Sequence, residues 1–170
     1  MALVNLTGRE THRWAVLEDD APVPPDARVL VSLARFARAG AELRVQAKGL
    51  GVVLRSDEAA EDLALLLDGL DIIALDFPAF GDGRAFSKAR RLRDQFGYQG
   101  ELRAIGETIP DQALFLARCG FDTIALPARF TYDHVKSALA AYTTWYQPAS
   151  DERPNVLHLR QADYARRQAS

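Results

Sequence analysis

Arginine is concentrated in one stretch of this sequence, from Phe77 to Asp122 and just beyond it. An arginine guanidinium binds planar or tetrahedral anions well, because its fork of N–H donors can meet two oxygen atoms at once. The same stretch contains the turn Gly81-Asp82-Gly83-Arg84, whose glycines let the backbone approach a ligand closely. We therefore expect an anion-binding face here. The arginines are Arg84, Arg90, Arg91, Arg93, Arg103, Arg118 and Arg129.

The turn precedes a predicted helix, whose first backbone amides would present a positive end to an anion. Arg103 lies inside an apolar strand pattern, so it needs a ligand or a carboxylate partner, for which Glu107, Asp76 and Asp111 are the candidates. The alternative is structural, with Asp82 capping the helix and Arg103 in an internal ion pair. The candidate anion ligands are Asp82, Gly83, Arg84, Ser87, Arg103, Asp111 and Gln112.

Arg90, Arg91 and Arg93 continue along the same predicted helix. They form a candidate surface for a protein partner. The alternative is a solvated basic face without a partner, which is the usual origin of such a run.

Composition excludes several other functions. The chain has 170 residues and a formal net charge of −2, which argues against binding nucleic acid. Its one cysteine, Cys119, permits no intramolecular disulfide and no dithiol centre, and its three histidines show no metal spacing. The sequence has no nucleotide-binding fingerprint, so we expect no cofactor and no metal. Without a signal peptide or an apolar run of about 20 residues, we expect a cytoplasmic protein away from membranes.

The elements that must position these residues alternate between strands and helices. We predict one α/β domain over residues 1–147, with an extension at 1–27, a regular core at 50–147 and a polar tail at 148–170. Residues 14–17 form a short strand, and residues 34–48 a short helix plus a loop. The other predicted strands are 28–33, 52–54, 71–77, 102–105 and 123–126, and the helices are 57–67, 84–96, 109–118 and 131–146.

This alternation implies parallel strands joined by right-handed crossovers. It favours a partial (βα) barrel, with an open doubly wound sheet as the alternative. An internal repeat with a shift of 51 residues supports the βα units, since Gly69, Asp71 and Ile73 recur as Gly120, Asp122 and Ile124. In both architectures ligands bind beyond the carboxyl ends of the strands. The loops there are Arg55–Ser56, Asp76–Arg84, Gly106–Glu107 and Pro127–Arg129.

The motif FPAFGDGRAFSKARRLR, followed by GYQGELRAIGETIPDQALFLARCGFD, resembles a bacterial family of unknown function, domain-of-unknown-function family 934. The resemblance runs from about residue 50 to 126. Members often carry the label "oxidoreductase probably involved in sulfite reduction". The resemblance implies an accessory role in assimilatory sulfate or sulfite reduction, which supplies cysteine synthesis, with the sulfite-reduction enzymes as partners and a small oxyanion as a possible ligand. A small (βα) enzyme acting on an anionic substrate and an oxidoreductase component are the alternatives.

Overall fold

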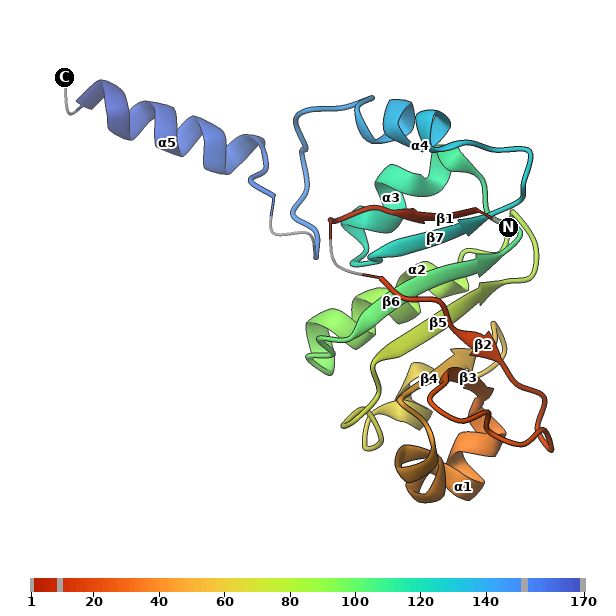
Figure 1. Ribbon diagram of the computed structural model, residues 1–170. Coiled ribbons are helices and arrows are strands. Elements are labelled where there is room, and N and C mark those ends of the chain that lie inside the picture. The colour runs from red at the N-terminus through yellow and green to blue at the C-terminus, as the bar shows by residue number, and fades with distance from the viewer. Residues whose placement is uncertain (1, 9–10, 151–152, 169–170) are drawn as a thin grey trace.

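The structure is a computed structural model that describes residues 2–8, 11–150 and 153–168. Within these residues, seven strands form one sheet in the spatial order β1-β7-β6-β5-β4-β3-β2 (Figure 1). Strands β2 to β7 run parallel to one another, and β1 pairs antiparallel with β7 at one edge. The strands are β1 Ala2–Asn5, β2 Ala15–Val16, β3 Arg28–Ser32, β4 Gly49–Leu54, β5 Ile72–Phe77, β6 Glu101–Gly106 and β7 Thr123–Leu126.

The parallel strands lie side by side in chain order, without the reversal that a doubly wound sheet requires at its switch point. Successive right-handed crossovers then place the helices on one face of the sheet. The curled sheet forms a half-barrel, which confirms the predicted partial (βα) barrel over the doubly wound alternative.

The two faces of the sheet have different surroundings. Successive side chains of each strand point to opposite faces of the sheet. On the face that the helices cover, residues such as Val52, Ile73 and Leu102 belong to the main hydrophobic core. On the open, concave face, Ile72 and Ala74 form a smaller apolar cluster. The covering helices are α1 Leu33–Gln46, α2 Arg84–Arg90, α3 Ala113–Arg118 and α4 Tyr132–Leu139, with short helical turns η1 Ala60–Leu63, η2 Arg91–Gln95 and η3 Pro110–Gln112.

The internal repeat corresponds to a shared way of starting a strand. Gly69 and Gly120 both have positive φ, at 77° and 93°, and each ends a turn two residues before an aspartate. The Asp71 carboxylate accepts a hydrogen bond from Leu50 N at 3.0 Å, and the Asp122 carboxylate accepts one from Leu102 N at 2.8 Å. Each aspartate therefore holds the beginning of its own strand against the beginning of the neighbouring one.

Three predicted elements differ from the structure. The helix predicted at 57–67 is only the turn η1; beyond it, Arg44 of α1 donates to the carbonyl oxygens of Leu66 and Asp68 at 3.3 and 2.8 Å, which satisfies them without a further helical turn. The helix predicted at 131–146 ends at Leu139. Instead of a short helix plus a loop, residues 33–46 form α1, with a kink at Ala39.

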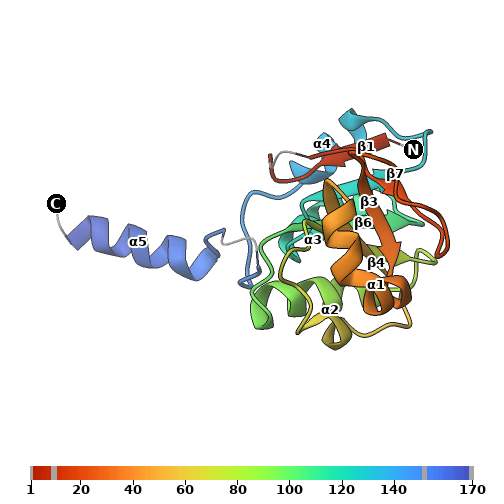
Figure 2. The same cartoon turned by 60° about the horizontal axis from the view of Figure 1, so that its bottom comes forward.

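Both ends of the chain also contain structure that the sequence patterns did not predict. In the N-terminal extension, β1 extends the sheet beside β7. In the polar tail, α5 covers Val156–Gln168 and points away from the rest of the molecule (Figures 1 and 2). Its start is set by Asn155, whose side-chain oxygen accepts hydrogen bonds from Leu157 N and His158 N at 3.0 and 3.1 Å.

Gly51 tests the packing of the concave face. An added Cβ would overlap Ile72 Cγ2 and lie 2.7 Å from the Ile72 backbone oxygen. We expect Gly51→Ala to lower the free energy of unfolding by about 2 kcal/mol, as overpacking does in a tight core. Urea denaturation measures this change. Gly81→Ala is the matched control, because no atom lies within 4 Å of its added Cβ; an equal loss for both variants would contradict the packing argument.

Candidate functional site

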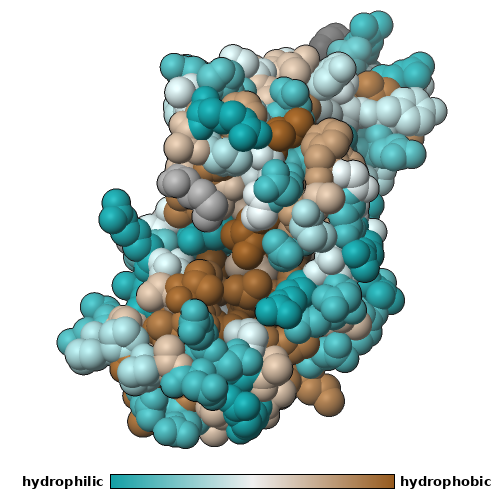
Figure 3. Space-filling view, turned by 90° about the vertical axis from the view of Figure 1, so that its right-hand side faces the viewer, coloured by the Kyte–Doolittle hydropathy of each residue, from teal (hydrophilic) through white to brown (hydrophobic). Residues whose placement is uncertain are grey.

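The carboxyl ends of the parallel strands meet at one rim of the sheet, which Figure 3 views face on. Hydrophobic side chains gather around a hollow in the middle of this face, and hydrophilic side chains surround them. Val53 and Ile105, on the concave face next to the rim, are only partly buried. The loops that follow β4 and β5 bring Arg55, Asp82 and Arg84 to this rim.

Asp82 and Arg84 form a closed ion pair in the loop between β5 and α2. Arg84 Nη2 lies 2.6 Å from Asp82 Oδ2, and Arg84 Nε donates to Asp82 Oδ1 at 3.0 Å. The side-chain hydrogen bond from Arg84 lowers the pKa of Asp82 to about 2. Arg84 Nη2 also donates to Ser56 Oγ at 3.0 Å, which joins the loops after β4 and β5. The pair therefore braces the rim.

Asp76 is the unusual group at this rim. Its carboxyl is half-buried near the end of β5, and burial raises its pKa, with Arg55 opposing the rise and Asp82 adding to it. Gly106 makes room for it, since a Cβ there would lie 2.7 Å from Asp76 Oδ1. Within the described part of the chain, the Asp76 side chain has no hydrogen-bond partner. A half-buried carboxyl with a raised pKa can hold and release a proton.

Two cations stand beside Asp76. Lys88 is half-buried, and burial, followed by the nearby charge of Arg84, lowers its pKa. Its Nζ donates to the Arg55 backbone oxygen at 2.6 Å. The Arg55 side chain is exposed directly after β4, and within the described ranges it has no ion-pair partner. Arg55, Asp76 and Lys88, which we call the rim triad, can offer charge and a proton to an anion.

Arg103 lies away from the rim, buried in the concave face of β6. Its Nε and Nη2 donate to Glu101 Oε1 at 2.9 and 2.7 Å, and Nη2 also donates to the His12 backbone oxygen at 3.1 Å. The carboxylate partner expected for a buried arginine is present, but it is Glu101 rather than Glu107, Asp76 or Asp111. Glu101 precedes Arg103 by two residues, so the two side chains share a face of the strand.

The other predicted ligands are also spread out. Ser87 is exposed on α2, one turn after Gly83, which precedes that helix. Gln112 caps η3 by accepting a hydrogen bond from Ile109 N at 3.1 Å. Asp111 is exposed and lines a groove of about 650 Å³ between η3 and α4. Of the predicted set, only Asp82, Gly83, Arg84 and Ser87 share the β5–α2 segment, while Arg103 and Asp111-Gln112 lie elsewhere.

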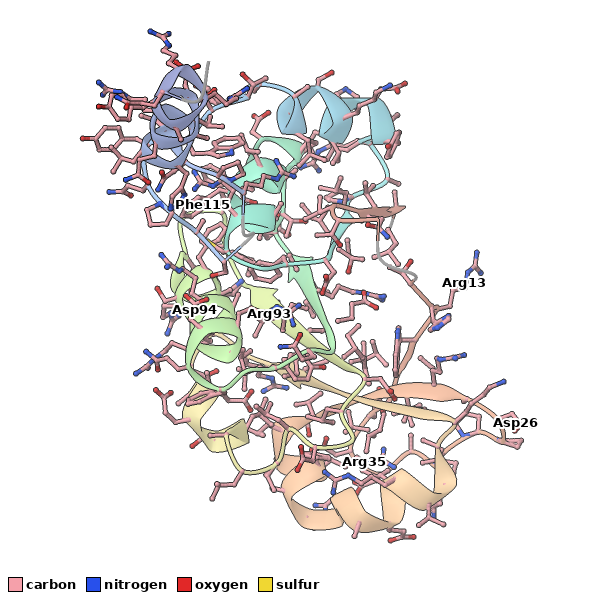
Figure 4. The ribbon with its side chains drawn as sticks, turned by 90° about the vertical axis from the view of Figure 1, so that its left-hand side faces the viewer. Arg13, Asp26, Arg35, Arg93, Asp94 and Phe115 are labelled. Carbon is pink, nitrogen blue, oxygen red and sulfur yellow. The ribbon has the colours of Figure 1, made fainter. Side chains whose placement is uncertain are left out.

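The three arginines of the predicted partner surface do not all face solvent. Arg90 and Arg91 are exposed, and they pair with Asp94 and Glu61 respectively. Arg93 is 16% exposed and donates to the backbone oxygens of residues 98, 100 and 120 at 2.5, 2.9 and 3.0 Å. Figure 4, seen from the amino ends of the parallel strands, shows Arg93 on the inner side of its helix and Asp94 on the outer side. Only Arg90 and Arg91 can therefore meet a partner directly.

The loops predicted at the carboxyl ends of the strands contain Arg55 and Asp76, but the sequence did not single out the rim triad. Arg55 and Asp76 each stand at the end of a buried apolar run, and this position is the signal that could have found them. The arginine-rich pattern pointed instead to residues that the fold uses internally.

The described residues contain no group of three or more His, Cys, Asp and Glu side chains that could hold a metal ion. None of their helices is both long enough and apolar enough to pass through a membrane. Cys119, the only cysteine in the sequence, is buried.

A family model described as "Bacterial protein of unknown function (DUF934)" matches residues 51–157. The match contains the whole rim triad and ends at the beginning of α5. No curated protein matches the chain. The resemblance inferred from the motif is thus confirmed.

Substitution of Arg93 and Arg90 tests whether the first is structural and the second a surface residue. We expect Arg93→Met to lower the free energy of unfolding by about 3 kcal/mol, because it leaves the nearly buried Asp122 carboxylate without its cation. Arg90→Met should cost less than about 0.5 kcal/mol, because its ion pair is exposed. Chemical denaturation of both variants gives the comparison, and equal losses would show that Arg93 is not structural.

Asp76 predicts a pH-dependent stability difference. Its pKa in the folded protein is raised above the unfolded value of about 3.9, so ionisation costs stability at pH values above both. We expect Asp76→Asn to melt at a higher temperature than the unmodified protein at pH 7. The advantage should disappear as the pH falls below the unfolded pKa. Melting curves across this pH range test it; a constant difference at every pH would contradict the raised pKa.

Proposed function

The chain belongs to this bacterial family of proteins of unknown function, and on that premise we propose that it is a cytoplasmic accessory protein of assimilatory sulfite reduction. In this role it binds a small oxyanion, with sulfite as the first candidate, at the rim triad. The pathway assignment is supported by the label that similar proteins carry, and it would place the protein in the supply of sulfide for cysteine biosynthesis. The binding assignment is supported by the rim itself.

The single observation that carries the binding proposal is the half-buried Asp76 carboxyl, on which the nearby charges of Arg55 and Lys88 act. A protonated carboxyl donates a hydrogen bond, and an oxyanion accepts one. Arg55 and Lys88 would balance the charge of the anion, while the Asp82–Arg84 pair holds the two loops in place. An anion beside Asp76 raises its pKa further, so binding and proton uptake are coupled.

An accessory role also fits the cysteine content. Reduction of sulfite requires an electron donor, and one buried cysteine cannot undergo dithiol exchange within the chain. We propose that a sulfite-reduction enzyme supplies the electrons and contacts the exposed Arg90 and Arg91. This contact would use acidic groups on the enzyme that replace Asp94 and Glu61.

The raised pKa of Asp76 also favours a second candidate function, a small (βα) enzyme in which Asp76 transfers a proton to or from an anionic substrate. The two functions differ in outcome. An accessory protein binds sulfite and leaves it unchanged, whereas an enzyme converts its substrate in the absence of other proteins.

Thermal unfolding with sulfite, sulfate and chloride tests the binding proposal. A ligand at about a hundred times its Kd should raise the melting temperature by roughly 5 to 10 °C. We expect sulfite to do so, and we expect the effect to weaken as the pH rises through the folded pKa of Asp76. Arg55→Met and Lys88→Met should abolish it, because each removes one of the two cations.

Arg90→Met is the matched control, since it removes an exposed cation outside the rim and should leave the sulfite effect intact. Asp76→Asn keeps a hydrogen-bond donor and should retain binding, whereas Asp76→Leu should lose it. The binding proposal is wrong if no oxyanion stabilises the protein, or if the rim variants respond like the unmodified protein. Separately, a deletion strain that grows normally on sulfate as its sulfur source would refute the pathway assignment.

A further inference from the structure

Helix α5 is anchored to the rest of the protein at its N-terminus, and none of its residues is buried. Val156 N donates to the Trp145 backbone oxygen at 2.7 Å, and the buried Asn155 caps the helix. Trp145 is itself held between Arg118 and Arg153, whose guanidinium carbons lie 4.6 and 5.9 Å from its ring centre. Beyond this anchor the helix projects into solvent, and none of its residues is buried (Figures 1 and 2).

A bare helix of this length needs a partner. Isolated helices shorter than about 12 to 15 residues are marginal in water, and most helical stability in proteins comes from packing. With 13 residues, α5 lies at this limit. Its helical form is therefore best explained by a surface on which it packs.

One face of α5 shows what that surface must be. Leu157, Arg160, Tyr164 and Arg167 recur at i, i+3, i+7 and i+10, which places them on one side of the helix. Leu157 and Tyr164 are 54% and 67% exposed. The face thus combines two large apolar side chains with two cations, of which Arg167 has an exposed ion pair with Asp163 at 2.9 Å. A partner that suits this face is acidic with an apolar centre.

The chain itself carries such a surface. Residues 56–71, which we call the acidic leucine segment, contain six acidic residues and no lysine or arginine. Asp71 and Glu61 are used within the fold, but Asp57, Asp62 and Asp68 are exposed. Among them lies Leu65, which is 97% exposed. An exposed leucine with exposed acids on both sides of it in the sequence matches the leucine, tyrosine and arginines of α5 in both polarity and charge.

We propose that α5 of one molecule docks on the acidic leucine segment of a second copy of this chain. Each copy has one helix and one segment, so two copies can exchange helices around a two-fold axis and satisfy both contacts. The association uses no residue of the rim triad itself, although the acidic leucine segment begins at Ser56, directly after Arg55.

Analytical ultracentrifugation of the full chain tests the proposal. We expect a concentration-dependent dimer at low salt that weakens at high salt, because exposed charges are screened within about 10 Å at 0.1 M salt. Leu65→Ser should weaken association at least about tenfold, and it should leave the melting temperature of the monomer unchanged, since Leu65 buries almost nothing. Arg160→Glu should weaken association similarly.

Arg166→Glu is the matched control, because it makes the same charge change on another face of α5 and should leave the dimer intact. Mixing the Arg160→Glu chain with an Asp68→Lys chain should produce a dimer tighter than either variant forms alone, since the reversed charges then face each other. A monomer at every concentration and salt would overturn the proposal. It would also be overturned by a dimer that survives Leu65→Ser and Arg160→Glu unchanged.

Discussion

The nearly buried ion pair between Arg93 and Asp122 connects the parts of the fold on which the rest depends. The Asp122 carboxylate accepts hydrogen bonds from the Arg93 side chain, from Leu102 N near the beginning of β6 and from the Thr7 hydroxyl after β1. Arg93 in turn reaches the Gly120 carbonyl before β7. Charges that are removed from water need several partners at once. This pair therefore fixes η2, which follows α2, against the beginnings of β6 and β7 and against the segment after β1.

The same requirement explains where the arginines go. Arg84, Arg93 and Arg103 each lie against a carboxylate within the fold, and Arg90 and Arg91 have acidic neighbours on the surface. A guanidinium paired in this way has little charge left for a ligand. The rim differs because Asp76 is half-buried without a hydrogen-bond partner among the described residues, beside Arg55 and Lys88. The candidate site is therefore identified by Asp76, Arg55 and Lys88 rather than by the number of arginines in the sequence.

The rim triad and helix α5 lie on different sides of the half-barrel. The rim triad stands at the carboxyl ends of the parallel strands, whereas α5 leaves the molecule on the opposite side (Figure 1). The family match spans the rim but reaches only the first residues of α5. Substitutions in α5 can therefore test the proposed self-association without altering the rim.

Local patterns in the sequence determined the parallel strands, their order and the loops at their carboxyl ends, but not the antiparallel strand β1. Apolar runs and helix-ending glycines are properties of neighbouring residues. The tertiary structure alone decided that Arg103 pairs with Glu101, that Arg93 turns inward and that Asp76 has no hydrogen-bond partner among the residues that the structure describes. It also decided that residues 57–67 form only one helical turn, after which Arg44 from another element binds the carbonyls of Leu66 and Asp68. Burial and ion pairing depend on which elements face each other, and that information is not local.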